Sequence, residues 1–442
     1  MSKALLSVAA LLLGAGILLV GNGLQSILLP VRGALEGFST SAIGYIGAAY
    51  PLGFVIACWT APYIVKRVGH IRSFAVLAAI AASVVLLYVL NVQPLSWVLL
   101  RIVSGYCFAG LFMVIESWLN EASSNANRGQ IFSAYMVVNL CTVTAGQMML
   151  PLGNPATFEL FSVAAIAITL GLVPVGLTTS AAPYPIARVQ LRLGRLYGMS
   201  PVGVLGCFFV GMANGAFGSL GPVFADGAGL STTGIALFMS AALIGGALGQ
   251  VPLGRLSDRI DRRKVIVLAC LLAIAIGVLL LLAGDARAGG RLFALSVPFA
   301  ELPMGALIGL VTLYGAAIYP LYALCIAHTN DFVGGEDFVE ASSGLLLTWG
   351  AGATVGPIIA AYLMEEVGLG GLFLYTGAAH AVFCVLALYR MRQRAPLPAE
   401  ERANYVLTTE HAQSTQAGVA LDPRAPDQPE APGAAPAAAA GL

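Results

Sequence analysis

The sequence predicts an all-α membrane protein in which twelve transmembrane helices form two pseudo-symmetric halves of six helices each. Three observations lead to this prediction. The 442 residues are 58% hydrophobic and only 10% charged, with a mean hydropathy of +0.87, whereas a soluble domain is roughly half apolar and a quarter charged. Twelve apolar segments are long enough to span a bilayer, which takes about 20 residues. A direct repeat relates the two halves of the chain.

The predicted spans divide the chain into two halves, a linker and a tail. The spans lie at residues 4–29, 40–64, 73–91, 95–119, 130–151, 158–178, 201–224, 233–254, 265–283, 304–327, 341–364 and 370–389. The first exceeds the roughly 7–15 apolar residues of a cleaved signal peptide, so we expect it to be a helix. Residues 1–178 form the N-terminal half, 179–200 a cytoplasmic linker and 201–394 the C-terminal half. The Ala/Pro-rich tail, 395–442, lacks apolar periodicity, and we expect it to be disordered in the cytoplasm.

The positions of the cations predict the orientation in the membrane. With the N-terminus inside, eighteen of the 22 Lys and Arg residues fall on the inner side, and the four on the outer side are Arg32, Arg101, Arg287 and Arg291. Cytoplasmic loops concentrate Lys and Arg. Both termini are therefore expected in the cytoplasm.

The repeat has a constant offset of 192 residues, the difference between 231 and 39. Ser39-Thr-Ser-Ala-Ile43 recurs as Ser231-Thr-Thr-Gly-Ile235, and Gly53 recurs as Gly245. Each serine can cap the helix that follows it. Parallel six-helix halves around a central substrate cavity are an arrangement found in secondary transporters.

One short loop between apolar segments has a distinctive spacing. It runs Gly254-Arg-Leu-Ser-Asp258-Arg259-Ile-Asp261-Arg262-Arg263-Lys264. This spacing resembles the signature loop of the major facilitator superfamily, the twelve-helix secondary transporters, with Asp261 in place of the family's second glycine. The resemblance implies the major facilitator fold and an inner gate formed by Gly254, Asp258, Arg259, Arg262 and Arg263. The alternative is a solvated basic loop.

Two further stretches resemble motifs of the same family. Arg101-Ile-Val-Ser-Gly105 resembles the fourth-helix arginine motif associated with proton coupling, with Ser104 in place of the usual amide. Alternatively, Arg101 extends to the outer surface. Glu121 and Arg128-Gly129 resemble the Glu…Arg-Gly turn between the fourth and fifth helices, which implies a gate or brace. The antiporter motif of the fifth helix is poorly matched by Gly146-Gln-Met-Met-Leu-Pro151, which weakens an export-antiporter assignment.

Glu116 is the acidic residue placed deepest in the predicted fourth span. An ionisable group at membrane depth is energetically expensive, so by default it is functional or paired. A buried carboxylate suits a carrier of protons. The alternative is a structural ion pair with Arg128.

Several polar and aromatic residues within the spans are candidates for the walls of a substrate cavity. Asn22 and Gln25 lie one helical turn apart, and Tyr135, Asn139 and Thr142 share one helix face. The remaining candidates are Asn214, Tyr319, Tyr322 and Trp349. The alternative is that the amides form hydrogen bonds between helices and the aromatic rings fill the core.

The first half carries a reversed charge at the inner gate. Lys66-Arg67 occupies the repeat position of Asp258-Arg259. In the family this acid faces the N-terminus of the eleventh helix, whose dipole favours negative charge. The loop before this chain's eleventh span contains Asp331, Glu336, Asp337 and Glu340 and no cation. We expect these acids to pair with Lys66 and Arg67 when the inner side closes.

The sequence thus predicts a secondary active transporter of a small solute, working by alternating access in a bacterial inner membrane, with proton coupling through Glu116. An uncoupled facilitator and a transport-inactive scaffold or sensor are the alternatives. We expect a monomer that contacts the lipid bilayer and a small-molecule substrate, and protons if coupled. A net charge of +1 offers no basis for nucleic-acid binding. The seven cysteines lie in apolar segments without a Cys-x-x-Cys spacing, so neither a disulfide nor a metal site is predicted. The sequence shows no cluster of a nucleophile with a base and no metal-ligand cluster, so we expect neither a cofactor nor enzyme activity.

Overall fold

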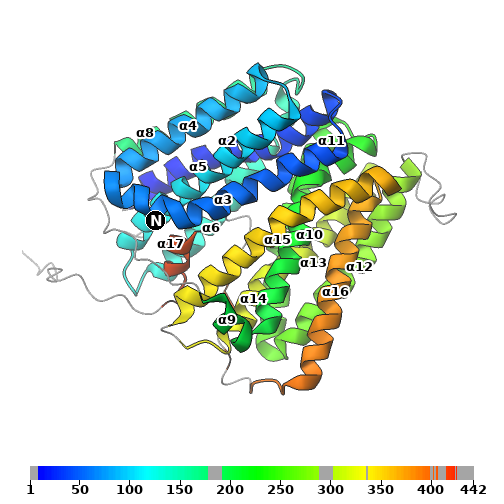
Figure 1. Ribbon diagram of the computed structural model, residues 1–442. Coiled ribbons are helices and arrows are strands. Elements are labelled where there is room, and N and C mark those ends of the chain that lie inside the picture. The colour runs from blue at the N-terminus through cyan, green and yellow to red at the C-terminus, as the bar shows by residue number, and fades with distance from the viewer. Residues whose placement is uncertain are drawn as a thin grey trace, which may run out of the picture.

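The computed structural model describes residues 8–177, 192–287, 302–334, 337–398, 402, 405–406, 415–423 and 425. Within this part of the chain, twelve helical segments are long and apolar enough to cross a membrane. The predicted fold class is confirmed, including the twelve spans. Figure 1 shows the two helical halves side by side, with the first half in blue to cyan and the second in green to orange.

The N-terminal half contains the first six spans. Its helices are α2 (Ala9–Leu35), α3 (Thr40–Val68), α4 (His70–Leu90), α5 (Pro94–Glu121), α6 (Arg128–Gln147) with the 3-10 turn η1 (Leu150–Leu152), and α7 (Glu159–Leu170) continued by α8 (Leu172–Gly176). Helix α2 continues beyond residue 29, where the predicted first span ends, since Pro30 is tolerated inside it; residues 4–7 of that predicted span lie outside the described residues.

The C-terminal half contains the other six spans. A short helix α9 (Leu193–Met199) precedes α10 (Pro201–Gly227), α11 (Thr232–Arg259), α12 (Arg262–Arg287), α13 (Met304–Ile318), α14 (Pro320–Asn330), α15 (Phe338–Val367) and α16 (Gly371–Gln393). The tenth span is divided at Tyr319, because Pro320 has no amide hydrogen to continue the α13 ladder.

The sequence repeat corresponds to repeated packing. Ser39 Oγ accepts a hydrogen bond from Ala42 N at 3.1 Å, and Ser231 Oγ accepts one from Gly234 N at 3.2 Å, so both predicted caps are confirmed. A Cβ on Gly53 would lie 2.0 Å from Ile102 O, and a Cβ on Gly245 would lie 2.0 Å from Thr312 O. Each glycine therefore permits the second helix of its half to cross the fourth with backbones in contact.

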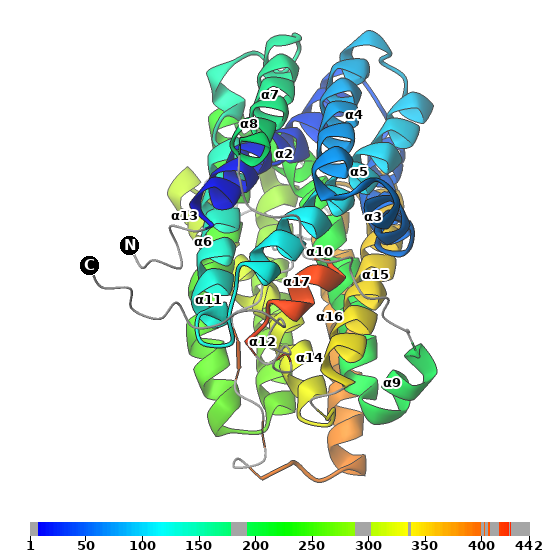
Figure 2. The same cartoon turned by 90° about the vertical axis from the view of Figure 1, so that its left-hand side faces the viewer.

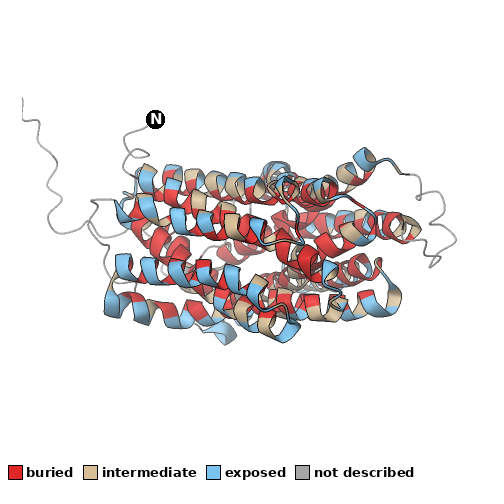
Figure 3. Cartoon of the chain, turned by 90° about the horizontal axis from the view of Figure 1, so that it is seen from above, coloured by how far each residue is buried: buried red, intermediate tan, exposed pale blue. Residues whose placement is uncertain are grey.

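Burial follows the pattern of a bundle in lipid. The interior of the two halves is buried, and many outward positions are exposed (Figure 3). Large apolar side chains such as Leu90, Leu248 and Val385 are among the exposed ones. Since lipid tails are apolar, these faces need no polar covering inside a bilayer.

The two halves meet at one end of the bundle. The end at which α3 and α11 finish and α10 and α15 begin carries most of the cations, and we call it the basic end. At the opposite end, the N of Ser41 donates to Glu365 Oε1 at 2.7 Å, and Ser240 Oγ donates to Gln147 Oε1 at 3.3 Å. A Cβ on Gly44 would lie 2.4 Å from the Cβ of Ala361, so α3 and α15 touch there.

A short segment of the C-terminal tail lies between the halves toward the basic end. Helix α17 (Gln416–Ala420) packs against α5 of the first half and α15 of the second, and Figure 2 shows it, in red, between the two groups of helices. Residues 415–423 belong to the tail that we expected to be disordered, and the structure gives them this short helix. The average composition of the tail could not predict this contact, because the contact depends on one residue. Ala417 packs with Ala57, Ala61, Ala109 and Met113.

Candidate transport cavity and gate

A cavity of about 190 Å³ lies between the two halves. Its walls come from α2, α3, α5 and α6 of the first half and from α10, α11 and α15 of the second. Because both halves contribute, a relative movement of the halves would change the cavity's shape and its access. This is the position expected for a substrate site between pseudo-symmetric repeats.

Four of the predicted cavity residues line it: Asn22, Arg101, Asn214 and Trp349. They come from four different helices, α2, α5, α10 and α15. Arg101 does not extend to the outer surface, because its side chain is 9% exposed and faces the cavity. Its guanidinium carbon lies 4.4 Å from the centre of the Tyr50 ring, a cation–π geometry.

The other predicted cavity residues lie in the surrounding packing. Gln25 Nε2 donates to Ser104 Oγ at 3.4 Å, and Thr142 Oγ1 donates to the Val138 carbonyl at 2.7 Å. Asn139 is buried beside them on α6. Tyr319 packs against Gly246, and the Tyr322 ring lies 6.1 Å from the Trp349 ring. None of these five is among the residues that line the cavity.

Glu116 is fully buried and accepts hydrogen bonds from two elements. Tyr135 donates its hydroxyl to Glu116 Oε1 at 3.2 Å. Thr415 of the tail donates to Oε2 twice, from its backbone N at 2.8 Å and from its Oγ1 at 2.6 Å. Tyr135 is therefore a partner of Glu116. The tail provides donors that the sequence pattern did not predict.

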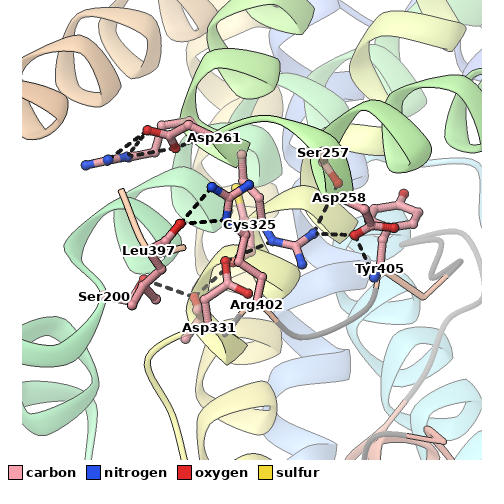
Figure 4. A network of polar contacts seen from close by, with 12 residues as sticks. Ser200, Ser257, Asp258, Asp261, Cys325, Asp331, Leu397, Arg402 and Tyr405 are labelled. Atoms are coloured by element: carbon pink, nitrogen blue, oxygen red, sulfur yellow. Dashed lines mark hydrogen bonds and ion pairs between the residues drawn. The ribbon is translucent and has the colours of Figure 1, made fainter. Parts of the chain in front are cut away.

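The α11–α12 turn forms a connected network of charges at the basic end (Figure 4). Arg262 is buried and donates from Nε to Asp331 Oδ2 at 2.9 Å and from Nη1 to Asp258 Oδ1 at 3.3 Å. Asp258 Oδ1 also accepts from the N of Tyr405 at 3.1 Å, and the Tyr405 ring covers Gly254. The network joins the turn to α14 and to the tail.

Asp261 and Arg263 form the second part of this network. Arg263 Nη2 donates to Asp261 Oδ2 at 2.8 Å, and its Nη1 donates to the Arg394 carbonyl at 2.8 Å. Burial alone would raise the pKa of Asp261, but the side-chain and backbone hydrogen bonds from Arg263 outweigh it, so this pKa lies below its usual value. Asp261 is thus the ionic partner of Arg263. Arg259 is exposed.

The acids at the start of α15 pair with the helix of the linker. Arg192 Nη2 lies 2.9 Å from Glu340 Oε2, and Arg195 Nη2 lies 2.8 Å from Asp337 Oδ2. Glu336 lies outside the described residues. Lys66 and Arg67 are exposed and form no ion pair with a described residue. In this conformation, therefore, α9 holds the acids that we expected to meet Lys66 and Arg67 in the closed state.

The turn between α5 and α6 also contacts the tail. Arg128 is buried, and it donates from Nη1 to the Ala425 carbonyl at 3.1 Å and from Nη2 to Asn125 Oδ1 at 2.9 Å. Glu121 is exposed at the end of α5. The tail thus forms hydrogen bonds with both Glu116 and Arg128. An ion pair between these two residues was one of the two alternatives that we considered from the sequence.

Several cavity residues were not predicted. Tyr50 and Phe54 lie one turn apart on α3, while Ser26, Gln147 and Ser219 add polar groups. Gln147 directly follows the polar face predicted on α6, so that face could have been extended to it. Tyr50 and Phe54 offered no such signal, since aromatic residues on a span also pack against lipid or core.

A cavity between two six-helix halves related by a repeat, lined by apolar residues with a few polar groups and closed at one end by contacts between the halves, is the architecture of a polytopic membrane transporter. A family model of the Major Facilitator Superfamily matches residues 11–289 and 203–423. The chain belongs to the Major Facilitator Superfamily. It is therefore a multi-pass membrane protein of a family of transporters of small molecules, and not an enzyme.

Known relatives agree with this assignment. The chain is similar to the "Uncharacterized MFS-type transporter YcaD" of Escherichia coli (strain SE11) and of Shigella flexneri, with 27% identity over 402 residues, which covers 88% of this chain and 97% of each relative. Among solved structures, it resembles a variant of the nucleoside transporter NupG, with a TM-score of 0.72, 11% identity and coverage of 87% of this chain and 99% of that one. It also resembles an inward-facing bacterial homologue of the lysosomal transporter Spinster, with a TM-score of 0.67, 15% identity and coverage of 92% and 100%.

Proposed function

We propose that this protein moves a small solute across a bacterial inner membrane by alternating access, with both termini in the cytoplasm and with proton coupling through Glu116. One observation carries the proposal: the cavity lies between the halves, while the halves touch at the opposite end through Ser41–Glu365 and Ser240–Gln147. A state open toward the basic end follows from this geometry. Rocking of the halves would open the other end.

The orientation supports the same proposal. The basic end carries the turns in which Lys and Arg concentrate, as cytoplasmic loops do. The structure therefore corresponds to an inward-facing state if this end lies in the cytoplasm. Glu116 lies toward this end, where its carboxylate would exchange protons with the cytoplasm once Thr415 withdraws.

Sided labelling of the cavity tests the proposal. Cys58 lines the cavity, and it would be the only cysteine in a background in which the other six are replaced by alanine. An impermeant maleimide is expected to label Cys58 from either face of oriented vesicles. Adding a cross-linked Ser41→Cys and Glu365→Cys pair should confine labelling to the cytoplasmic face. Labelling from one face only, with or without the cross-link, would refute alternating access.

Proton coupling has its own test. A pH gradient is expected to change the rate of Cys58 labelling from the outer face, and Glu116→Gln should abolish this response because a glutamine cannot take up the proton. Glu159→Gln, at an exposed acid that begins α7, serves as the control. A response that survives Glu116→Gln would favour the uncoupled facilitator, in which Glu116 has a structural role. The three hydrogen bonds that hold Glu116 support that alternative.

A further inference from the structure

The cavity contains one charged side chain. Among the described residues that line it, Arg101 is the only one with a formal charge, and the rest are apolar, aromatic, amide, hydroxyl or thiol groups. Glu116 is not among the lining residues and is held by Tyr135 and Thr415. Among the described lining residues, Arg101 is therefore the group that a charged ligand could pair with directly.

Two N–H donor groups of the buried Arg101 side chain have no hydrogen-bond acceptor. Its Nε and Nη1 are buried without a hydrogen-bond partner, and it forms no ion pair with a described residue. The Tyr50 ring compensates part of the charge, but a buried donor of a charged group that stays unsatisfied is costly. Such an arrangement is stable in a binding site because a ligand can supply the missing acceptors.

The orientation of the guanidinium leaves its donors available. The Tyr50 ring covers one face of the group at 4.4 Å from the guanidinium carbon. The N–H donors of a guanidinium point outward in its plane, where they match the two oxygens of a carboxylate. The contact with Tyr50 therefore does not use the Nε and Nη1 donors, which have no hydrogen-bond partner.

We propose that Arg101 binds the anionic group of the substrate, which makes the substrate a small organic anion with a carboxylate or a similar oxyanion. Phe54, Met239 and Trp349 line the same cavity and would contact an apolar or aromatic body. This inference rests on the proposed transport function and adds the substrate class to it.

Matched pairs of ligands test the charge requirement. The purified full-length protein is titrated with a carboxylate and its neutral amide, using benzoate with benzamide and hexanoate with hexanamide. Thermal unfolding reports binding, as does the intrinsic fluorescence of the four tryptophans, of which Trp349 lines the cavity. Because hydrogen bonds to charged groups are worth about 1.5–3 kcal/mol, the carboxylate should bind about 10- to 100-fold more tightly than its amide. Arg101→Gln should remove this preference, and Arg101→Lys should retain part of it.

The outcomes separate the two proposals. Binding of neither member, equal binding of both, or a carboxylate preference that survives Arg101→Gln would overturn the anionic substrate. If Cys58 is nevertheless labelled from both faces, the transport function stands and only the substrate class is wrong.

A second inference rests on a different observation, the position of the tail. The tail residues 415–423 and 425 contact the first half: Thr415 donates to Glu116, Arg128 donates to the Ala425 carbonyl, and Thr415 and Leu421 have no exposed surface. Helix α17 contacts both α5 and α15, one from each half. The segment thus occupies the space that the halves would need in order to meet at the basic end.

We infer that residues 415–423, together with Ala425, are a displaceable plug, which holds the two halves apart at the basic end until it withdraws. Ala417 packs against Ala57, the neighbour of the cavity residue Cys58. The bound plug should therefore also slow the entry of reagents from the basic side.

Labelling of Cys58 from the basic face tests the plug. Thr415→Val removes one of the charge-assisted hydrogen bonds to Glu116, so the labelling rate should rise about tenfold, while Thr415→Ser keeps the hydroxyl and the slow rate. Ala417→Trp cannot fit among Ala57, Ala61 and Met113 and should raise the rate by displacing α17. A rate that is the same in the wild type, Thr415→Val and Ala417→Trp would overturn the plug.

Discussion

The two copies of the turn after the second helix of each half differ in how their charges are satisfied. At the α11–α12 turn, buried Arg262 joins Asp258 and Asp331 in one network. At the α3–α4 turn, Lys66 and Arg67 are exposed, and the acids that could meet them are bound to Arg192 and Arg195 of α9. The second half therefore has an assembled internal brace, whereas the two cations at the turn of the first half form no ion pair with a described residue.

The same difference extends to the tail. In the second half, Asp258 accepts from the Tyr405 backbone beside an existing ion pair. In the first half, Glu116 accepts a hydrogen bond from Thr415 of the tail, and Arg128 donates one to the Ala425 carbonyl. Duplication has preserved the helix packing, while the polar contacts have diverged. The sites of divergence are those that a gate would use.

The largest expected effect comes from breaking the assembled brace. Arg262→Ala would break the buried ion pair with Asp331, and breaking such a pair by removing one member typically costs about 3–5 kcal/mol. The free energy of unfolding, measured by denaturant titration in detergent, should fall by that amount. Arg259→Ala at an exposed position of the same loop is the control, and an equal loss in both variants would contradict the comparison.

The second prediction concerns the close helix crossing that the two halves share. Gly53→Ala and Gly245→Ala each place a methyl group against a backbone carbonyl, at Ile102 and Thr312 respectively. Overpacking of this kind costs about 1–3 kcal/mol, and the two variants should lose similar amounts of unfolding free energy. A large loss in one and none in the other would show that the halves are not packed alike.

A smaller effect is expected from the exposed charges of the first half. Lys66→Glu should raise the fraction of inward-facing molecules, because a cation can no longer meet the acids before α15, and Asp337→Lys should partly rescue it. Exposed pairs contribute only about 0–1 kcal/mol each, so a shift of a few-fold is expected. Cysteine accessibility at the basic end measures it, and no change in either variant would reject the charge-swapped gate.

The smallest effect concerns pH. The Arg263 bonds depress the pKa of Asp261 below its usual 3.8, so the pair stabilises the folded state above that pH and loses its contribution as pH falls through the folded-state pKa. The difference in unfolding free energy between the wild type and Asp261→Asn should be constant near neutral pH and shrink below about pH 4. A difference that instead grows on acidification would refute the assigned direction.

The sequence predicted the fold well because its determinants are local. Apolar length identified the twelve spans, and Ser39 and Ser231 identified two helix starts, since each effect acts within a few residues of the chain. The cavity was predicted in part, because periodicity gives the face of a helix but not the neighbour that the face meets. Arg101 and Trp349 face the cavity, whereas Tyr135 faces Glu116 and Tyr319 packs on Gly246. The Thr415–Glu116 contact joins residues 299 positions apart, and no local pattern encodes such a contact.

Paired distance measurements test the central claim most directly. Spin labels at Thr40→Cys and Glu366→Cys report the separation of α3 and α15 at the opposite end, and labels at Arg67→Cys and Val339→Cys report it at the basic end. In membranes, conditions or variants that shorten the basic-end distance should lengthen the opposite-end distance in the same fraction of molecules. Distances that change together, or that change at neither end, would contradict alternating access about the cavity.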